Sequence, residues 1–280
     1  MTEAETIEAL LRAGQQQLAA APLAPPAAGQ LEAQLLLAHA LGVGRSELQA
    51  HPERSVPPAA AALYRELLER RGGGEPVAYL TGRKEFWSLT LEVTPAVLVP
   101  RPETELLVER ALALGPARAR VADLGTGSGA IALALASERP AWQVTATDRC
   151  AAALQVAQRN GVRLALAVEW RLGDWFAALG PATFDLIVCN PPYVASSDPA
   201  LAALRFEPRT ALTPGADALA SLRTLARDAP AHLERGGWLI LEHGAGQAPA
   251  VRAALVAAGF AHVTSHRDLA GHERCTEGQR

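Results

Sequence analysis

Apolar residues in the first 74 positions recur with the period of α-helices. A first helix has Gly14 within its apolar face, and residues 2–5 have the Thr-x-x-Glu spacing of a capping box. Prolines in residues 22–26 end this helix, and a more apolar second helix is closed by Gly42. A third helix opens at residues 55–58 and ends at the glycines of 72–74. The pattern predicts a small helical bundle over residues 1–75. The apolar face of the first helix consists of Ile7, Leu10, Leu11 and Leu18.

The pattern changes after residue 75. Residues 76–82 and 86–93 show the alternation and aromatic content that are typical of short strands, so we expect a β-hairpin linker over residues 76–100. A helix should follow, with Pro102 in its first turn.

From residue 101 to residue 280, strand and helix patterns alternate. Such alternation predicts an α/β domain of Rossmann-like, doubly wound type with a mostly parallel sheet. Two extended stretches at the end of the chain favour an antiparallel hairpin at the sheet edge. The expected strands are 120–124, 143–147, 164–171, 184–189, 238–242, 261–267 and 272–276, and the expected helices are 130–137, 151–160, 218–233 and 247–258.

Composition narrows the class of protein. The chain has 280 residues, 49% of them hydrophobic, with a formal net charge of −3 and three cysteines. The small negative charge argues against stable nucleic-acid binding, and the widely spaced cysteines indicate a reducing compartment without a metal site. Acidic residues near the amino terminus do not fit a signal peptide, and no apolar run has the length of a membrane span. We therefore expect a cytoplasmic protein, acting as a monomer away from membranes.

A glycine-rich loop follows the first strand of the α/β domain. The spacing is GxGxG, with Asp123 at the end of the strand; both differ from the pyrophosphate-binding GxGxxG pattern and favour S-adenosylmethionine over NAD. Asp123 can hold the cationic methionyl part, directly or through water, and Asp148 at the end of the next strand can accept both ribose hydroxyls. Trp175 offers an aromatic edge near an adenine ring, although plain packing is an equally good explanation. The predicted loop residues are Gly125, Thr126, Gly127, Ser128 and Gly129.

The motif Asn190-Pro191-Pro192-Tyr193 ends an apolar strand. Parallel sheets bind ligands at such strand ends. The Asn190 side-chain oxygen and a main-chain carbonyl in the turn can accept the NH2 hydrogens of a planar nitrogen and aim its lone pair at a methyl group. The prolines restrict the backbone that carries these acceptors, and Tyr193 can stack on the planar group. The motif predicts methyl transfer to an amide or amino nitrogen.

The chain resembles the HemK/PrmC family of bacterial peptide-chain release factor glutamine N(5)-methyltransferases. The resemblance is carried by residues 76–82, 85–87, 99–105, the glycine loop, residues 190–193, and residues 206–208 with 211–212. It implies a class I S-adenosylmethionine-dependent domain preceded by a helical domain that docks the substrate protein. It also implies that the loop, Asp148, Trp175 and Asn190 contact the cofactor, and that residues 190–193 hold the glutamine of the Gly-Gly-Gln loop in class 1 release factors.

Some residues and activities stay open at this stage. Arg101 and Glu103 are candidate substrate-binding residues, but with Glu105 they fit a surface ion-pair cluster equally well. His243 departs from the family pattern, and we expect a histidine at the core edge with a satisfied hydrogen bond. Three alternatives remain: glutamine methylation of a ribosomal protein, adenine-N6 methylation of nucleic acid, and a binding module that has lost turnover.

Overall fold

The computed structural model describes residues 5–21 and 29–280, which form two compact units, Met1–Arg83 and Lys84–Arg280. The first unit is helical, as the sequence predicted. Its core joins residues from its long helices, such as Ile7, Leu36 and Tyr64. The hydroxyl of Thr6 accepts a hydrogen bond from the Ala9 N–H and caps the first helix. The capping box predicted at residues 2–5 is wrong, because the N-cap is Thr6 and Glu5 precedes the helix instead of lying in its first turn. The predicted proline break lies outside the described residues. The helices are α1 (Ile7–Ala20), α2 (Gly29–Leu41), α3 (Arg45–Ala50), α4 (Pro58–Gly72) and α5 (Val77–Thr81).

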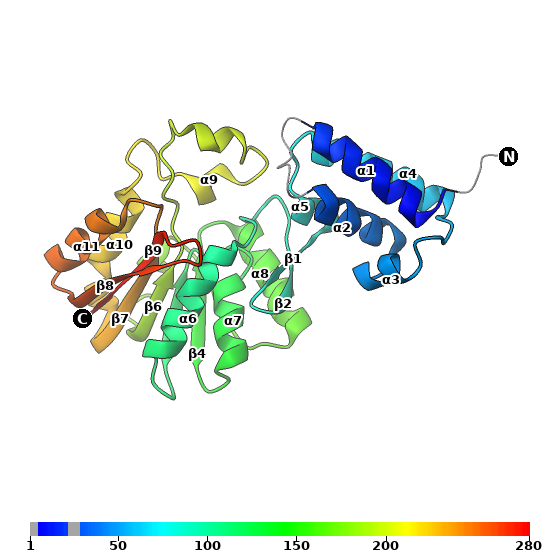
Figure 1. Ribbon diagram of the computed structural model, residues 1–280. Helices are drawn as coiled ribbons and strands as arrows, with labels where there is room; N and C mark the ends of the chain where they lie inside the picture. Colours follow the sequence, from blue (N-terminus) through cyan, green and yellow to red (C-terminus); the bar gives the residue numbers. More distant parts are fainter. Residues whose placement is uncertain (1–4, 22–28) are drawn as a thin grey trace. The chain divides into compact units, whose positions relative to one another are not determined.

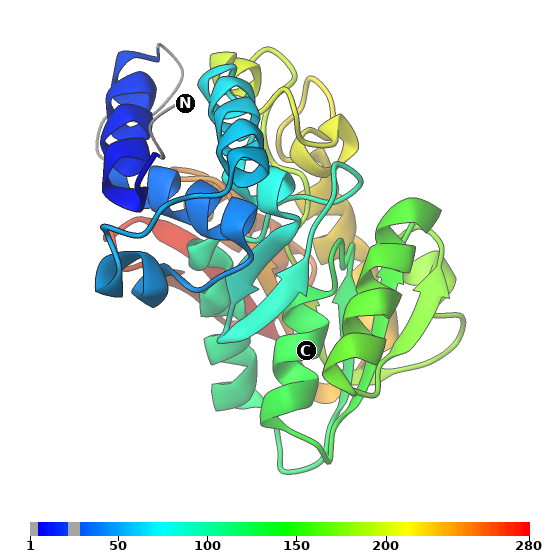
Figure 2. The same ribbon diagram turned by 90° about the vertical axis from the view of Figure 1, so that its right-hand side faces the viewer.

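Residues 77–81 correct part of the predicted hairpin. Pro76 precedes them, they form helix α5, and Gly82 ends the helix with a φ of 69°. The alternation in this stretch was therefore not a strand signal. The hairpin itself consists of β1 (Arg83–Phe86) and β2 (Leu89–Glu92), joined by Trp87 and Ser88, which both have positive φ. Strand β2 packs beside helix α8 (Ala151–Leu164) in both views (Figures 1 and 2).

The second unit contains, in its described residues, a seven-stranded sheet in the order β5-β4-β3-β6-β7-β9-β8. Strands β3 to β7 are parallel, and β8 and β9 form an antiparallel pair at one edge. This confirms the predicted fold class. The strands are β3 (Arg120–Leu124), β4 (Gln143–Asp148), β5 (Glu169–Leu172), β6 (Phe184–Cys189), β7 (Leu233–Glu242), β8 (Ala261–Arg267) and β9 (Glu273–Gln279).

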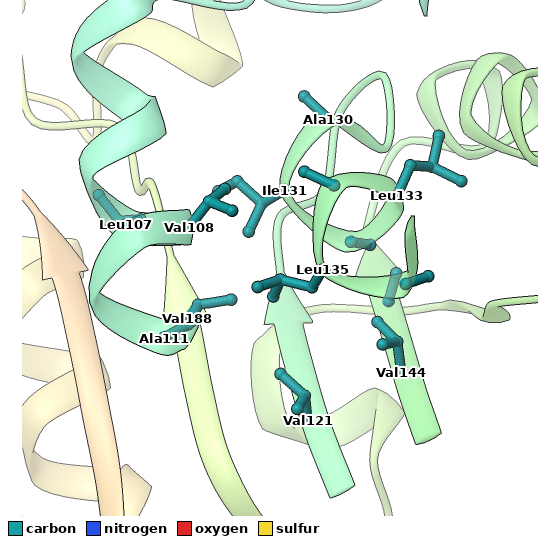
Figure 3. Packing of buried hydrophobic residues seen from close by; sticks show 14 of the residues in the cluster. Leu107, Val108, Ala111, Val121, Ala130, Ile131, Leu133, Leu135, Val144 and Val188 are labelled. Carbon is teal, nitrogen blue, oxygen red and sulfur yellow. The ribbon is translucent and has the colours of Figure 1, made fainter. Parts of the chain in front are cut away.

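Helices cover both faces of the sheet. On one face, α6 (Glu105–Leu114) and α7 (Ala130–Glu138) form a core with alternate residues of β3, β4 and β6. Figure 3 shows Val108 of α6 and Ile131 of α7 close together above Val121 of β3. On the other face, α10 (Ala220–Asp228), α11 (Ala248–Ala257) and the short helix η2 (Trp175–Ala178) pack on the intervening strand residues. Because both faces are covered, the central strands contain runs of buried residues, such as 121–124 of β3 and 186–189 of β6.

Short elements account for most differences from the predicted pattern. Strand β5 covers only Glu169–Leu172. In the first part of its predicted range, Leu164 ends helix α8, Ala165 lies in a turn, and residues 166–168 belong to no helix or strand. The elements α3, η2 and α9 (Arg209–Leu212) have six residues or fewer and were not predicted. So few residues cannot display a helical period. Two further short helices, η1 (Pro102–Thr104) and η3 (Pro199–Ala202), begin at prolines, and η4 (Ala229–His232) follows α10. Within residues 5–21 and 29–280, no helix is long and apolar enough to cross a membrane.

Candidate active site

A cavity of about 320 Å³ lies at the carboxyl ends of β3, β4 and β6. Parallel strands end at one edge of the sheet, so residues that are far apart in sequence meet there. The predicted site residues that line the cavity are Arg101, Gly125, Thr126, Gly127, Ser128, Asp148, Trp175, Asn190 and Pro192. Five other predicted residues, all described by the structure, do not line it: Glu103, Asp123, Gly129, Pro191 and Tyr193.

The glycine loop turns sharply between β3 and α7. The main-chain N–H groups of Gly125 and Thr126 both donate to the Thr147 carbonyl of β4, each at 2.9 Å. Gly127 has a φ of 57°, and a Cβ atom there would meet nothing within 4 Å. A Cβ atom on Gly125 would lie 3.1 Å from the Trp175 ring. The glycines therefore let the backbone approach Trp175 while leaving space beside Gly127 on the cavity wall.

Asp123 lies behind this loop. Its side chain is fully buried and accepts hydrogen bonds from the Thr126 hydroxyl at 2.6 Å and the Ala132 N–H at 3.2 Å. Burial raises the pKa of Asp123 to about 7, against the lowering effect of these two hydrogen bonds. The second carboxyl oxygen, Oδ1, has no hydrogen-bond partner among the described residues. Asp123 thus shapes the loop and retains one free acceptor atom.

Asp148 and Trp175 approach the cavity from neighbouring strands. Asp148 Oδ2 accepts from the Gly127 N–H at 2.9 Å, and Oδ1 accepts from the Cys150 N–H at 2.8 Å. These bonds fix the carboxylate at the cavity wall, and each oxygen keeps a lone pair for another donor. Trp175 is a non-glycine residue with a φ of 43°. Its ring lines the cavity and also packs on the core. Both roles considered for Trp175 are therefore compatible with its position.

Asn190 follows β6 and lines the cavity. Its Nδ2 atom donates to Thr104 Oγ1 at 3.1 Å, and Thr104 is buried. The phenol of Tyr193 donates to Glu242 Oε1 at 3.0 Å. Glu242 is buried at the end of β7, next to β6, because Cys189 pairs with Leu241 in the sheet register. The Tyr193 hydroxyl is therefore anchored to the sheet rather than exposed in the cavity.

Burial raises the pKa of Glu242 to about 7. Interactions of its carboxyl with the hydroxyls of Thr104 and Tyr193 favour the ionised form, as does the charge of Arg274. Burial also raises the pKa of the Tyr193 phenol, with the nearby Glu242 charge as the next cause. The site thus contains a buried carboxyl that sequence reasoning did not identify.

Arg101, Glu103 and Glu105 do not pair with one another. Arg101 forms an ion pair with Glu207, whose other oxygen accepts from the Val99 N–H at 3.0 Å. Glu105 accepts from the Trp87 N–H at 2.9 Å, and Glu103 is exposed. The surface ion-pair cluster is therefore wrong. Only Arg101 of the three lines the cavity.

His243 is buried, as expected for a histidine at the core edge. Its Nδ1 lies 3.1 Å from the Gly244 carbonyl, and its Nε2 lies 2.8 Å from the Thr276 hydroxyl. A proton on Nδ1 satisfies the carbonyl, and the unprotonated Nε2 accepts from the threonine. Burial lowers the pKa of His243, which favours this neutral form.

Comparison with known proteins assigns the family. Residues 9–82 match the family described as PrmC N-terminal domain, and residues 102–220 match the family described as methyltransferase small domain. The chain is 52% identical over 254 residues to the release factor glutamine methyltransferase of Pseudomonas aeruginosa, covering 89% of this chain and 92% of that protein. The chain belongs to the release factor glutamine methyltransferase family. The family member of Vibrio cholerae is 45% identical, with 98% of this chain and 96% of that protein covered.

Solved structures add that the fold of this family member is a methyltransferase fold. A Pyrococcus furiosus methyltransferase superposes with a TM-score of 0.53 at 20% identity, covering 68% of this chain and 88% of that one. A Thermus thermophilus 16S rRNA methyltransferase, solved with AdoMet and guanosine, gives a TM-score of 0.52 at 23% identity and covers 71% of this chain and 49% of that one. At this identity, the likeness concerns the fold alone.

S-adenosylmethionine, the cofactor expected of this methyltransferase family, fits the residues present. The open space beside Gly127, the two-oxygen acceptor Asp148 and the Trp175 ring suit a nucleoside with a polar tail. Asp123 is fully buried and does not line the cavity, so its contact with the methionyl part of the cofactor stays a prediction.

Sequence reasoning missed several residues that support the site. Thr104 stands within the Pro-Glu-Thr-Glu segment, and Glu242 ends an apolar strand next to the one that precedes Asn190. An acid at the end of a buried strand was a usable signal for Glu242. Further cavity residues come from the segment around α9 and the start of α10, including Thr210, Thr213 and Ser221. They lack a recognisable motif.

Proposed function

We propose that this chain transfers the methyl group of S-adenosylmethionine to the side-chain amide nitrogen, N5, of the glutamine in the Gly-Gly-Gln loop of class 1 peptide chain release factors. The observation that carries the proposal is Asn190 at the wall of the same cavity as the glycine loop and Asp148. The names of relatives at 45% to 52% identity supply the substrate class. We further propose that the enzyme acts as a monomer in the cytoplasm. We also propose that it does not bind nucleic acid stably, because its net charge is −3.

Bound S-adenosylmethionine supplies an electrophilic methyl group on a sulfonium. The glutamine nitrogen is a weak nucleophile, because its lone pair is delocalised into the carbonyl. Asn190 Oδ1 and a main-chain carbonyl of the 190–193 turn accept the two N–H hydrogens, so the lone pair points along the transfer direction. The same acceptors stabilise the positive charge that develops on nitrogen. The methylated nitrogen is then acidic enough to lose a proton to water.

Pro191 and Pro192 restrict the turn that carries these acceptors, and Pro192 lines the cavity. Tyr193 contributes through its anchored phenol, which holds the turn against Glu242. Tyr193 does not line the cavity, so stacking of its ring on the glutamine amide stays a prediction. We assign the helical unit Met1–Arg83 to recognition of the release factor, because the PrmC N-terminal family matches residues 9–82. None of the described residues in the core of this unit lines the cavity.

The assay compares three substrates with labelled cofactor: purified release factor, total ribosomal protein, and nucleic acid. The proposal expects label in release factor only. The Asn190→Ala variant should lower the rate at least ~100-fold, because a positioned acceptor is lost.

Each other outcome identifies an alternative. Label confined to ribosomal protein would establish a ribosomal glutamine substrate, and protease-resistant label in nucleic acid would establish adenine methylation. Cofactor binding without turnover on all three substrates would establish a binding module. Unchanged activity of Asn190→Ala would refute the mechanism.

A further inference from the structure

The two ends of the Asn190 side-chain amide do opposite chemistry. The oxygen accepts hydrogen bonds, and the NH2 group donates them. Only the oxygen is useful to a substrate NH2 group. A free asparagine side chain could turn either end toward the cavity, and the wrong end would repel the substrate nitrogen. The structure places Asn190 Nδ2 at 3.1 Å from Thr104 Oγ1, which leaves the oxygen for the cavity.

The Thr104 hydroxyl has one proton and can serve one acceptor. Its neighbours are the Asn190 amide and the Glu242 carboxyl. The Asn190 amide occupies the Thr104 hydroxyl oxygen as an acceptor, so the hydroxyl proton is available for the Glu242 carboxyl, whose buried Oε2 atom has no hydrogen-bond partner among the described residues. Tyr193 also donates to Glu242, at 3.0 Å, which is consistent with an acceptor at this position. The hydrogen-bond donors of these three side chains therefore point in one direction: Asn190 donates to Thr104, and the Thr104 proton is directed to Glu242.

We propose that Thr104 and Glu242 are positioning residues that fix the Asn190 side-chain amide with its oxygen toward the cavity. Neither residue is expected to contact the reacting atoms: Thr104 and Glu242 are buried, and each acts through Asn190. This inference rests on the proposed function, because the amide orientation matters only for a substrate that presents an NH2 group.

Glu242 must be ionised for this polarity. Burial raises the pKa of Glu242 to about 7, so the measurements below are made at pH 8, above that pKa. The groups around it oppose one another: Arg274 favours ionisation and Glu103 disfavours it. Burial raises the pKa of the Cys189 and Cys275 thiols, which keeps both thiols neutral. The titratable and charged groups that act with this carboxyl are Glu103 before α6, Cys189 of β6, Tyr193 of the turn, and Arg274 and Cys275 of β9.

Three substitutions separate the effect of hydrogen-bond direction from the effect of side-chain size and shape. Thr104→Val keeps the shape and removes the hydroxyl, whereas Thr104→Ser keeps the hydroxyl. Glu242→Gln keeps the size, but its NH2 group can donate to Thr104. The Thr104 proton would then go to the Asn190 oxygen and turn the amide around. The matched control is Thr145→Val, because Thr145 is also buried and its hydroxyl donates to a carboxylate, Glu169, at 3.2 Å in mid-strand β4.

The first readout needs no substrate. In ¹⁵N-labelled enzyme at pH 8, the Asn190 side-chain amide signal, assigned by its loss in Asn190→Asp, should show one slowly exchanging proton. We expect this protection in the wild type, Thr104→Ser and Thr145→Val, and its loss in Thr104→Val and Glu242→Gln. Equal protection in all of these proteins would overturn the proposal.

The second readout is the rate on release factor with saturating cofactor. We expect kcat to fall at least ~10-fold in Thr104→Val and Glu242→Gln, because a misoriented acceptor loses the attack geometry. The KM for the cofactor should change less than twofold, and Thr104→Ser should restore most of kcat. Loss of amide protection with unchanged kcat would also overturn the proposal.

The two readouts test the proposed function and the orientation of the Asn190 amide separately. A wild-type enzyme that never labels release factor refutes the proposed function, and amide protection still decides the orientation. If circular dichroism shows that Thr104→Val does not fold, Thr104→Ser and Glu242→Gln decide the proposal with the same two readouts.

Discussion

Asn160 joins three parts of the catalytic unit through one fully buried side chain. Its Oδ1 accepts from the Glu92 N–H at 2.7 Å, and its Nδ2 donates to the carbonyls of Glu92 at 3.0 Å and Ser128 at 2.9 Å. Helix α8 is thereby tied both to strand β2 of the hairpin and to the glycine loop. We predict that Asn160→Ala destabilises this unit more than any surface substitution on the same helix.

The magnitude follows from the groups that lose their partners. The substitution removes a partner from one N–H, two carbonyl groups and the Arg163 guanidinium, which donates to Asn160 Oδ1 at 3.1 Å. Each unmade buried hydrogen bond costs about 1–3 kcal/mol. Glu92 is half-buried, so water can reach part of its backbone. We expect a loss of about 3–5 kcal/mol in the free energy of unfolding, which corresponds to a fall of roughly 2 M in the urea midpoint.

Tryptophan fluorescence is a suitable assay, because all five tryptophans of the chain lie after residue 83 and report on the unit Lys84–Arg280. Gln158→Ala is the matched control, since Gln158 is exposed on the same helix. The variant should also bind S-adenosylmethionine more weakly, because Ser128 lines the cavity. A loss below ~1 kcal/mol in Asn160→Ala would refute the reasoning.

Three further predictions concern charge and stacking at the site. Burial raises the pKa of Asp123 from 3.8 to about 7, so the free energy of unfolding should fall as pH rises through this range. Asp123→Asn should weaken this pH dependence, measured by urea midpoints at pH 5.5 and 8, and should lower cofactor affinity, measured by calorimetric titration. Equal pH dependence in both proteins would contradict the assignment. Arg101→Ala should cost about 3 kcal/mol of stability, because it leaves Glu207, with 2% of its side chain exposed, without its counter-ion. If Arg101→Ala instead changes only the KM for release factor, Arg101 is a substrate-binding residue alone. Trp175→Ala should weaken cofactor binding at least ~10-fold through lost stacking, and an unchanged Kd in calorimetry would assign Trp175 to packing.

The order of strands and helices in the catalytic unit could be predicted because both faces of its sheet are covered. Strands β3 and β6 have the predicted bounds, since fully buried strands are marked by continuous apolar runs between turn residues. Residues 77–81 were mispredicted as a strand, because five residues can satisfy two periods at once and Pro76 can begin a helix as well as interrupt a strand.

The site was predictable where a backbone turn leaves a signal in the sequence. The glycines of the loop and the prolines after Asn190 mark such turns, and most of these residues line the cavity. Thr104 and Asn160 leave no such signal, because their importance lies in partners that are distant in sequence. Glu242 is marked only by its place at the end of an apolar strand. Asn160, for example, bonds Glu92 across 68 positions. Only the register of β6 against β7 brings Glu242 next to the turn after Asn190.

The central claim is that one glutamine side chain of a release factor is methylated at its nitrogen by a site organised around Asn190. The most direct measurement is tandem mass spectrometry of purified release factor after incubation with the enzyme and S-adenosylmethionine. We predict a gain of the mass of one CH2 unit on the glutamine of the Gly-Gly-Gln loop with wild-type enzyme, and almost none with Asn190→Ala. An added CH2 on another residue, or an unmodified loop beside a methylated ribosomal protein, would contradict the account.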